Sequence, residues 1–206
     1  MTSRRLPPAA RAPVLLVTGF GPFPRVADNP SGRVAMTVDG TTRFGVHFVG
    51  RVVPVHWADA WTHIAGHINA IRPDGVVMLG VGRRTRVEIE RIARNRAGGS
   101  VDAAGLTSSS PLIDPDGPAE LETRLPWRSL LAAGVGLSTD AGDYLCNYVF
   151  YRAMRALRDH TAICGFVHLP PRLTGAEQRL LDRMARWLHR QGSATPICLD
   201  PRMAPS

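Results

Sequence analysis

The sequence predicts an α/β protein, a three-layer α/β/α sandwich around a mixed, mostly parallel and twisted sheet. Short apolar runs typical of buried strands alternate along the chain with segments whose apolar residues recur at helical spacing. Such alternation favours a sheet covered by helices on both faces. The 206 residues suit one domain with a sizeable core, and no internal repeat interrupts them. We therefore expect a flexible lead-in at residues 1–13 and a single domain over residues 14–206.

Six strands and five helices are expected from the patterning. Strands are expected at residues 14–17, 44–55, 75–80, 87–92, 135–137 and 162–169. Helices are expected at residues 30–38, 59–71, 127–133, 145–160 and 175–190. Pro30 suits the first turn of the first helix, Pro73 with Gly75 stops the second, and Pro170-Pro171 breaks the last strand. Residues 96–117 are rich in Gly, Ser, Asp and Pro and predict a long surface loop, which is often functional.

The composition argues against several classes of protein. No apolar run approaches the ~20 residues of a membrane span, and the basic N-terminus lacks the apolar segment of a secretory signal. The three cysteines are odd in number and not closely paired, which argues against a disulfide framework. His63 and His67 lack the glutamate of the zinc-peptidase pattern, and there is no Cys-x-x-Cys motif. A soluble, cytoplasmic protein without metal or cofactor is expected.

The positive charge is weak support for nucleic-acid binding. The formal net charge is +8, but all 25 basic residues are arginine, and this total avoidance of lysine favours codon bias over selection for phosphate contacts. The densest stretch runs from Arg83 to Arg96 and alternates with apolar residues. We interpret that stretch as mostly a solvated face, with nucleic acid an improbable partner.

Cys146 carries the strongest functional signal. It follows Gly142-Asp143-Tyr144-Leu145, where a turn gives way to a helix-patterned segment. A thiol at a helix N-terminus is favoured as the nucleophilic thiolate by the positive end of the helix dipole. Free cysteines are also often buried and inert. Cys164, in a buried strand run, and Cys198, near the C-terminus, lack the favourable context.

Two further residues are candidates with weaker local support. His168 ends a predicted strand, and reactive groups gather at the carboxyl ends of strands in open α/β sheets. It could take a proton from a thiol, although a core histidine bonded to a backbone carbonyl fits its position equally well. Alternation places Glu88 and Glu90 on one strand face, where, taken alone, both are expected to be solvated charges paired with arginines.

Four blocks of sequence together resemble the pyroglutamyl peptidase I family of cysteine peptidases. They are Val17-Thr18-Gly19-Phe20-Gly21-Pro22-Phe23 with Asn29-Pro30-Ser31, Glu90-Arg91-Ile92-Ala93-Arg94-Asn95, Ala141-Gly142-Asp143-Tyr144-Leu145-Cys146-Asn147, and Gly165-Phe166-Val167-His168-Leu169-Pro170-Pro171. The resemblance spans about residues 14–188. Each block alone is moderately specific, whereas four in the right order in a chain of this length are strongly specific.

The resemblance implies roles for six residues. Cys146 would be the nucleophile, His168 its general base and later acid, and Glu90 the group that orients the imidazole. The backbone N–H of Cys146 would form part of the oxyanion hole. Phe20 and Phe23 would flank a flat pyrrolidone ring, with Asn29 serving the same pocket. The sequence departs from the family at Pro24-Arg25, in the short arginine-containing stretch before Glu90, and in the loop after Asn95.

The implied activity is that of a cysteine exopeptidase, an omega peptidase, that removes pyroglutamate from N-terminally pyroglutamylated peptides through an acyl-enzyme. The resemblance also implies a homo-oligomer, either a dimer or a tetramer. Two alternatives stay open. The first is a cysteine amidase on the same scaffold that acts on another small cyclic or N-acyl amide. The second is a catalytically retired, arginine-rich binding protein.

Overall fold

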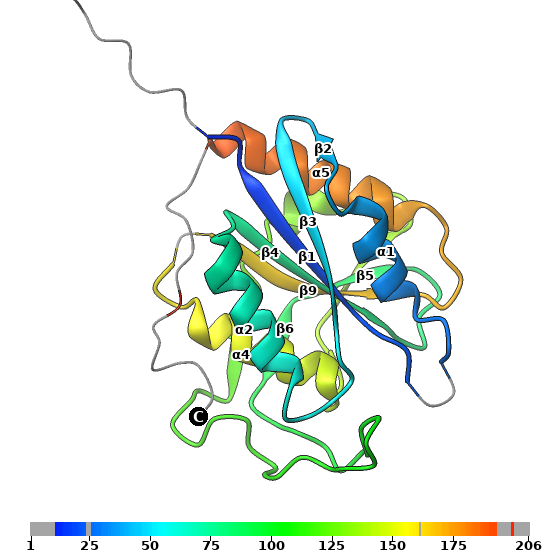
Figure 1. Ribbon diagram of the computed structural model, residues 1–206, viewed down its shortest axis with the longest axis vertical. Coiled ribbons are helices and arrows are strands. Elements are labelled where there is room, and N and C mark those ends of the chain that lie inside the picture. Colours follow the sequence, from blue (N-terminus) through cyan, green and yellow to red (C-terminus); the bar gives the residue numbers. More distant parts are fainter. Residues whose placement is uncertain (1–10, 24–25, 161, 193–198, 200–206) are drawn as a thin grey trace, which may run out of the picture.

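A seven-stranded sheet runs through the centre of the computed structural model, which describes residues 11–23, 26–160, 162–192 and 199 (Figure 1). The strand order is β2-β3-β1-β4-β9-β5-β8. These strands are β1 (Val14–Phe20), β2 (Thr42–Arg43), β3 (Val46–Val53), β4 (Gly75–Val81), β5 (Val87–Glu90), β8 (Val135–Ser138) and β9 (Ile163–Leu169). A separate two-stranded sheet joins β6 (Ile92–Arg94) to β7 (Glu120–Glu122).

The sheet is mixed but mostly parallel, as the sequence predicts. Strands β3, β1, β4 and β9 run parallel to one another, and β8 runs parallel to β5. Strand β5 is antiparallel to β9, and the short β2 is antiparallel to β3. The central strands β1, β4 and β9 are buried along almost their whole length. Their near-continuous apolar runs are typical of strands covered on both faces.

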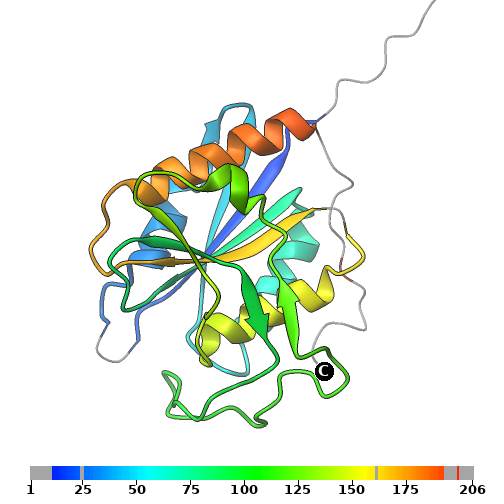
Figure 2. The same ribbon diagram turned by 180° about the vertical axis from the view of Figure 1, so that it is seen from behind.

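Helices cover both faces of the sheet, which confirms the three-layer prediction (Figures 1 and 2). The helices are α1 (Pro30–Val38), α2 (Ala60–Ile71), α3 (Trp127–Leu130), α4 (Leu145–Ala156) and α5 (Ala176–Gln191). The apolar sides of α1 and α5 pack in one buried cluster, and those of α2 and α4 pack in the other. None of the helices in the described ranges has the length and hydropathy that crossing a membrane requires.

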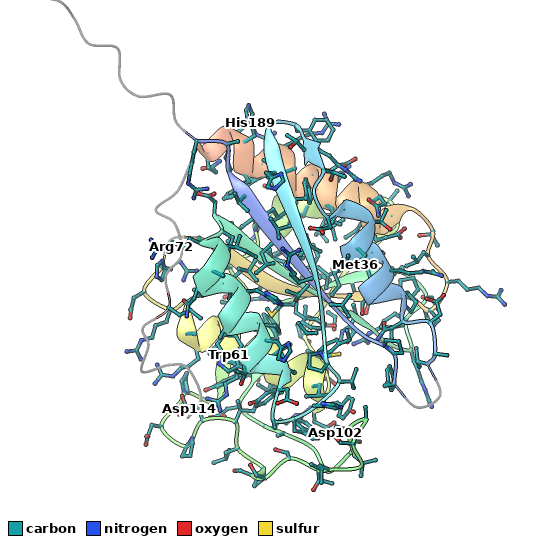
Figure 3. All side chains as sticks on the ribbon, viewed as in Figure 1. Met36, Trp61, Arg72, Asp102, Asp114 and His189 are labelled. Atoms are coloured by element: carbon teal, nitrogen blue, oxygen red, sulfur yellow. The ribbon has the colours of Figure 1, made fainter. Side chains whose placement is uncertain are left out.

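The expected long loop is real, but it is firmly attached to the body of the protein. Residues 95–119 contain no helix or strand. Asp102 is 5% exposed and accepts hydrogen bonds from the backbone N–H groups of Trp57, Ala104 and Leu106. The other end is fixed by an ion pair of 2.8 Å between Asp114 Oδ2 and Arg155 Nε. Figure 3 shows Asp102 and Asp114 at opposite ends of this segment, below Trp61.

Several predicted boundaries are wrong for local reasons. The strand expected at 44–55 begins at Val46, because Phe44 and Gly45 adopt positive φ angles of 50° and 74° in the turn between β2 and β3. The strand expected at 87–92 divides at Arg91 into β5 and β6, which belong to different sheets. The predicted helix at 127–133 ends at Leu130, and the sequence pattern did not predict β7.

Some predictions fall where the structure makes no statement. Most of the expected lead-in at residues 1–13, the Pro24-Arg25 departure and Cys198 lie outside the described residues.

Candidate active site

Cys146 is the second residue of α4 and is partly exposed. The chain enters the helix through Gly142, whose φ of 82° makes the turn that the sequence indicates. The first intrahelical N–H bond is donated by Tyr148 to the carbonyl of Tyr144. The N–H of Cys146 therefore belongs to the first turn, whose donors have no acceptor within the helix. The thiol lies at the positive end of the helix dipole, as predicted.

Gly80, near the carboxyl end of β4, makes room for this thiol. A Cβ atom at Gly80 would lie 2.8 Å from Cys146 Sγ and 2.7 Å from Cζ of Phe166. In the pairing of β4 with β9, Gly80 is opposite His168. The thiol thus lies beside the carboxyl ends of two neighbouring strands, one of which carries the histidine.

His168 and Glu90 form a buried hydrogen-bonded pair. His168 Nδ1 lies 2.6 Å from Glu90 Oε1, and the two residues are 5% and 0% exposed. Strand β5 is antiparallel to β9, with Glu88 opposite His168. Glu90 is therefore the diagonal neighbour of His168 on the same face of the sheet. The expectation of a solvated charge is wrong for Glu90, because its side chain is fully buried, whereas the expected pairing with an arginine is present as a contact of 3.2 Å with Arg84.

The electrostatics of His168 favour its protonated form. Burial alone would lower its pKa, but the charge of Cys146, hydrogen bonding to Cys146 and Glu90, and the charge of Glu90 outweigh burial and raise the pKa of His168 to about 9. An imidazolium between a thiolate and a carboxylate is the ion pair that a cysteine nucleophile requires near neutral pH.

Arg84 completes this cluster, and the sequence interpretation missed it. Its Nη2 lies 3.2 Å from Glu90 Oε1 and donates to the carbonyl of Asp140 at 2.7 Å. Its Nε lies 3.2 Å from Oε2 of Glu88. The prediction that the arginine-rich stretch forms a solvated face is therefore wrong for Arg84. No sequence spacing signals the contact, because Arg84 reaches Glu90 from the loop between β4 and β5.

A small apolar cavity opens beside the thiol. Its volume is about 40 Å³, which is enough to hold water. The residues around it come from β1 and the loop that follows it, the loop between β3 and α2, the end of β4, and the start of α4. They are Phe20, Phe23, Asn29, Val55, Val81, Tyr144, Leu145 and Cys146. The structure thus brings all three predicted pocket residues to the candidate nucleophile.

Asn29 contributes to the cavity mainly by shaping its loop. Its side-chain Nδ2 donates to the carbonyl of Gly21 at 3.0 Å, and its Oδ1 accepts from Ser31 N at 3.1 Å as the N-cap of α1. Ser31 Oγ in turn accepts from the N–H of Phe20 at 3.0 Å. These bonds use the polar atoms of Asn29 to fix the segment that follows Phe20.

The remaining cysteine of the described part of the chain is chemically different. Cys164 is fully buried in β9, and burial raises the pKa of its thiol to about 12. Within the described ranges, no group of three or more His, Cys, Asp or Glu side chains is arranged to hold a metal ion. Among the described thiols, only Cys146 combines access with a neighbouring base.

A thiol, an imidazole and a carboxylate at the strand ends of an α/β sheet, next to an apolar pocket, are the groups that define cysteine hydrolases. The profile of the pyroglutamyl peptidase family matches residues 14–178. The chain is 35% identical over 168 residues to pyrrolidone-carboxylate peptidase 1 of Ralstonia nicotianae, covering 77% of this chain and 78% of that one. It is 32% identical over 190 residues to a pyrrolidone-carboxylate peptidase of Pseudomonas fluorescens, covering 85% and 89% of the two chains. The chain belongs to the pyroglutamyl peptidase family.

Solved structures agree with this assignment. A pyrrolidone carboxyl peptidase from Pyrococcus furiosus superimposes with a TM-score of 0.78 at 26% identity, covering 86% of this chain and 99% of that one. The pyrrolidone carboxyl peptidase of Thermococcus litoralis shares the fold with a TM-score of 0.80, covering 91% and 100% of the two chains at 24% identity.

Proposed function

We propose that this chain hydrolyses the amide bond after an N-terminal pyroglutamyl residue, with Cys146, His168 and Glu90 as its catalytic groups. The observation that carries the proposal is the buried 2.6 Å contact between His168 Nδ1 and Glu90 Oε1 next to a thiol at a helix N-terminus. The family assignment and the names of the relatives support the choice of substrate.

The first half of the reaction forms a thioester. The thiolate of Cys146 adds to the carbonyl carbon of the pyroglutamyl residue, and the carbonyl oxygen becomes an oxyanion. The backbone N–H of Cys146, in the first turn of α4, donates to that oxygen. The imidazolium of His168 then gives its proton to the nitrogen of the leaving peptide as the C–N bond breaks. Glu90 holds the imidazole by Nδ1, so that its other nitrogen faces the reaction.

Hydrolysis of the thioester regenerates the thiolate. Neutral His168 takes a proton from a water molecule whose oxygen adds to the thioester carbonyl. The C–S bond then breaks, the electron pair returns to Cys146 Sγ, and pyroglutamic acid leaves. One water molecule is consumed, and the imidazolium and thiolate of the starting state are restored.

The apolar pocket supports the proposed selectivity for a lactam. A pyroglutamyl ring has no charged α-amine, whereas an ordinary N-terminal residue does. Burying that amine in a mostly apolar cavity is costly, which favours substrates that lack it.

The experiment compares three fluorogenic amides on the purified chain: pyroglutamyl, prolyl and glutamyl aminomethylcoumarin. The prolyl amide keeps the five-membered ring but has a charged amine. We expect cleavage of the pyroglutamyl amide alone, insensitivity to a metal chelator, and complete loss of activity after iodoacetamide treatment.

Two cysteine variants localise the activity. Cys146→Ala is expected to fold normally and to lose essentially all turnover. Cys164→Ala is the matched control, because Cys164 is fully buried and away from the reaction, and it should keep its rate. Turnover that persists after alkylation, or in Cys146→Ala, refutes the mechanism. Cleavage restricted to other amides in a panel of N-acyl aminomethylcoumarins would favour the amidase alternative.

A further inference from the structure

We propose that Arg84 is a positioning residue for the reaction, which holds the side chain of Glu90 against His168 and whose positive charge helps to set the pH range in which the site is active. This inference rests on the proposed function of Cys146, His168 and Glu90. It assigns a role to a residue in the loop between β4 and β5, a segment that the sequence pattern indicates only as a solvated arginine-rich stretch.

The environment of Glu90 shows why a second cation matters. The side chain is 0% exposed, and its contacts with both His168 Nδ1 and Arg84 Nη2 converge on Oε1. Its other oxygen, Oε2, is buried with no hydrogen-bond partner among the described residues. An isolated buried carboxylate is strongly disfavoured. While His168 is neutral, as it must be to accept a proton from water, Arg84 is the cation among the described residues that still contacts Glu90.

Arg84 is itself held in place from three directions. Nε contacts Glu88 at 3.2 Å, and Nη2 contacts both Glu90 and the carbonyl of Asp140. Asp140 lies in the segment that leads through Gly142 to Cys146. One planar guanidinium thus joins the carboxylate end of the cluster to the segment that positions the thiol. A lysine amine could supply the positive charge, but it could not supply several N–H donors held in fixed directions by one planar group.

The groups that face the cluster come from four parts of the fold. They are Cys146 and Tyr144 at the start of α4, His168 on β9, Glu88 and Glu90 on β5, and Arg84 and Arg86 in the preceding loop. Removing the positive charge of Arg84 favours the protonated form of every titratable neighbour. Both the acid and the alkaline limits of activity should therefore move to higher pH.

The test measures kcat/KM for pyroglutamyl aminomethylcoumarin, and the rate of Cys146 alkylation by iodoacetamide, as functions of pH. Three variants are compared with the wild type: Arg84→Gln, Arg84→Lys and Arg86→Gln. Arg86 is the matched control, because its side chain is 57% exposed, so that solvent screens its charge, and it makes no ion pair with Glu90 among the described residues. Thermal unfolding of each variant checks the fold.

We expect Arg84→Gln to lower kcat about tenfold with little change in KM, and to move both pH limits upward by about half a unit to one unit. Arg84→Lys should keep the pH limits of the wild type while losing part of kcat, because it keeps the charge but not the fixed directions of the donors. Arg86→Gln should match the wild type. Arg84→Met replaces the glutamine variant if that variant does not fold.

The inference is overturned if Arg84→Gln has the pH limits of the wild type, or if Arg84→Lys shows the same shift as Arg84→Gln. It is also overturned if both neutral variants fail to fold while the lysine variant folds, since Arg84 would then be purely structural. Alkylation needs no substrate. A wild-type protein that does not cleave the pyroglutamyl amide therefore refutes the proposed function, while the alkylation profiles still decide the role of Arg84.

Discussion

A single methyl group added at Gly80 is expected to disable the site while leaving the fold in place. The Cβ of Gly80→Ala would lie 2.8 Å from Cys146 Sγ and 2.7 Å from Phe166 Cζ. Unstrained contacts between such atoms are about 3.5–4.0 Å long, so either the thiol or the strand must move by roughly 1 Å. The φ of Gly80 is not positive, so the substitution introduces no backbone strain of its own.

The displacement translates into a large kinetic effect. A misplacement of about 1 Å in a reacting group can cost on the order of 100-fold in rate. We therefore expect kcat/KM for pyroglutamyl aminomethylcoumarin to fall about 100-fold, mainly in kcat. Overpacking against Phe166 should lower the free energy of unfolding by about 1–3 kcal/mol. The rate of Cys146 alkylation should also change, because the thiol leaves its place beside His168.

Gly66→Ala is the matched control. Gly66 lies on the exposed side of α2, and a Cβ there meets nothing within 4 Å. Alanine is expected to raise the free energy of unfolding by about 0.5–1 kcal/mol and to leave kcat/KM unchanged. A Gly80→Ala protein that folds with the stability expected here and cleaves at the wild-type rate would show that Gly80 does not determine the position of the thiol.

Three further outcomes follow from the same contacts. The pKa of His168 is raised from 6.5 to about 9, so the contribution of this residue to stability is full below pH 6.5 and is lost as the pH rises through about 9. Urea titrations at several pH values should show this loss of stability, and the loss should be smaller in Cys146→Ala. Glu90→Gln removes the carboxylate that stabilises the imidazolium, so kcat should fall about 10²–10⁴-fold and the alkaline limit of kcat/KM should move to lower pH, contrary to the shift expected for Arg84→Gln. Asp102→Ala removes three backbone hydrogen bonds from the long loop and should cost about 2 kcal/mol in chemical denaturation, with faster limited proteolysis between residues 96 and 117.

Most of the fold could be predicted because the information is local. Strands β1, β4 and β9 appear in the sequence as short apolar runs, and α2, α4 and α5 appear as apolar stripes, with a clear stop signal after α2. Without such a signal, the helix expected at residues 145–160 is too long, since α4 ends at Ala156. The turn before Cys146 and the strand end at His168 are also local features. These two residues could therefore be proposed as candidates before their mutual geometry was known.

The place of Glu90 could not be predicted in the same way. The alternation Val87-Glu88-Ile89-Glu90 has the pattern of a strand with one face in water, and only the strand order shows that β5 lies between β9 and β8. The burial of its carboxylate depends on partners that are distant in sequence or placed by a loop, His168 and Arg84. The resemblance to a family, rather than the pattern itself, indicated a special role for Glu90.

The pairing register of β5 with β9 links the stability of the core to the geometry of the candidate site. Val87 and Ile89 point into the cluster shared with α1 and α5, whereas Glu90 points to the opposite face, toward the start of α4. Because side chains alternate along a strand, a slip of one residue would exchange these faces. It would expose Ile89 to the polar cluster and bury Glu90 among apolar side chains, away from His168. The apolar residues of β5 thus favour the register in which the carboxylate of Glu90 lies against His168. The burial that stabilises the sheet therefore also positions the proposed catalytic pair.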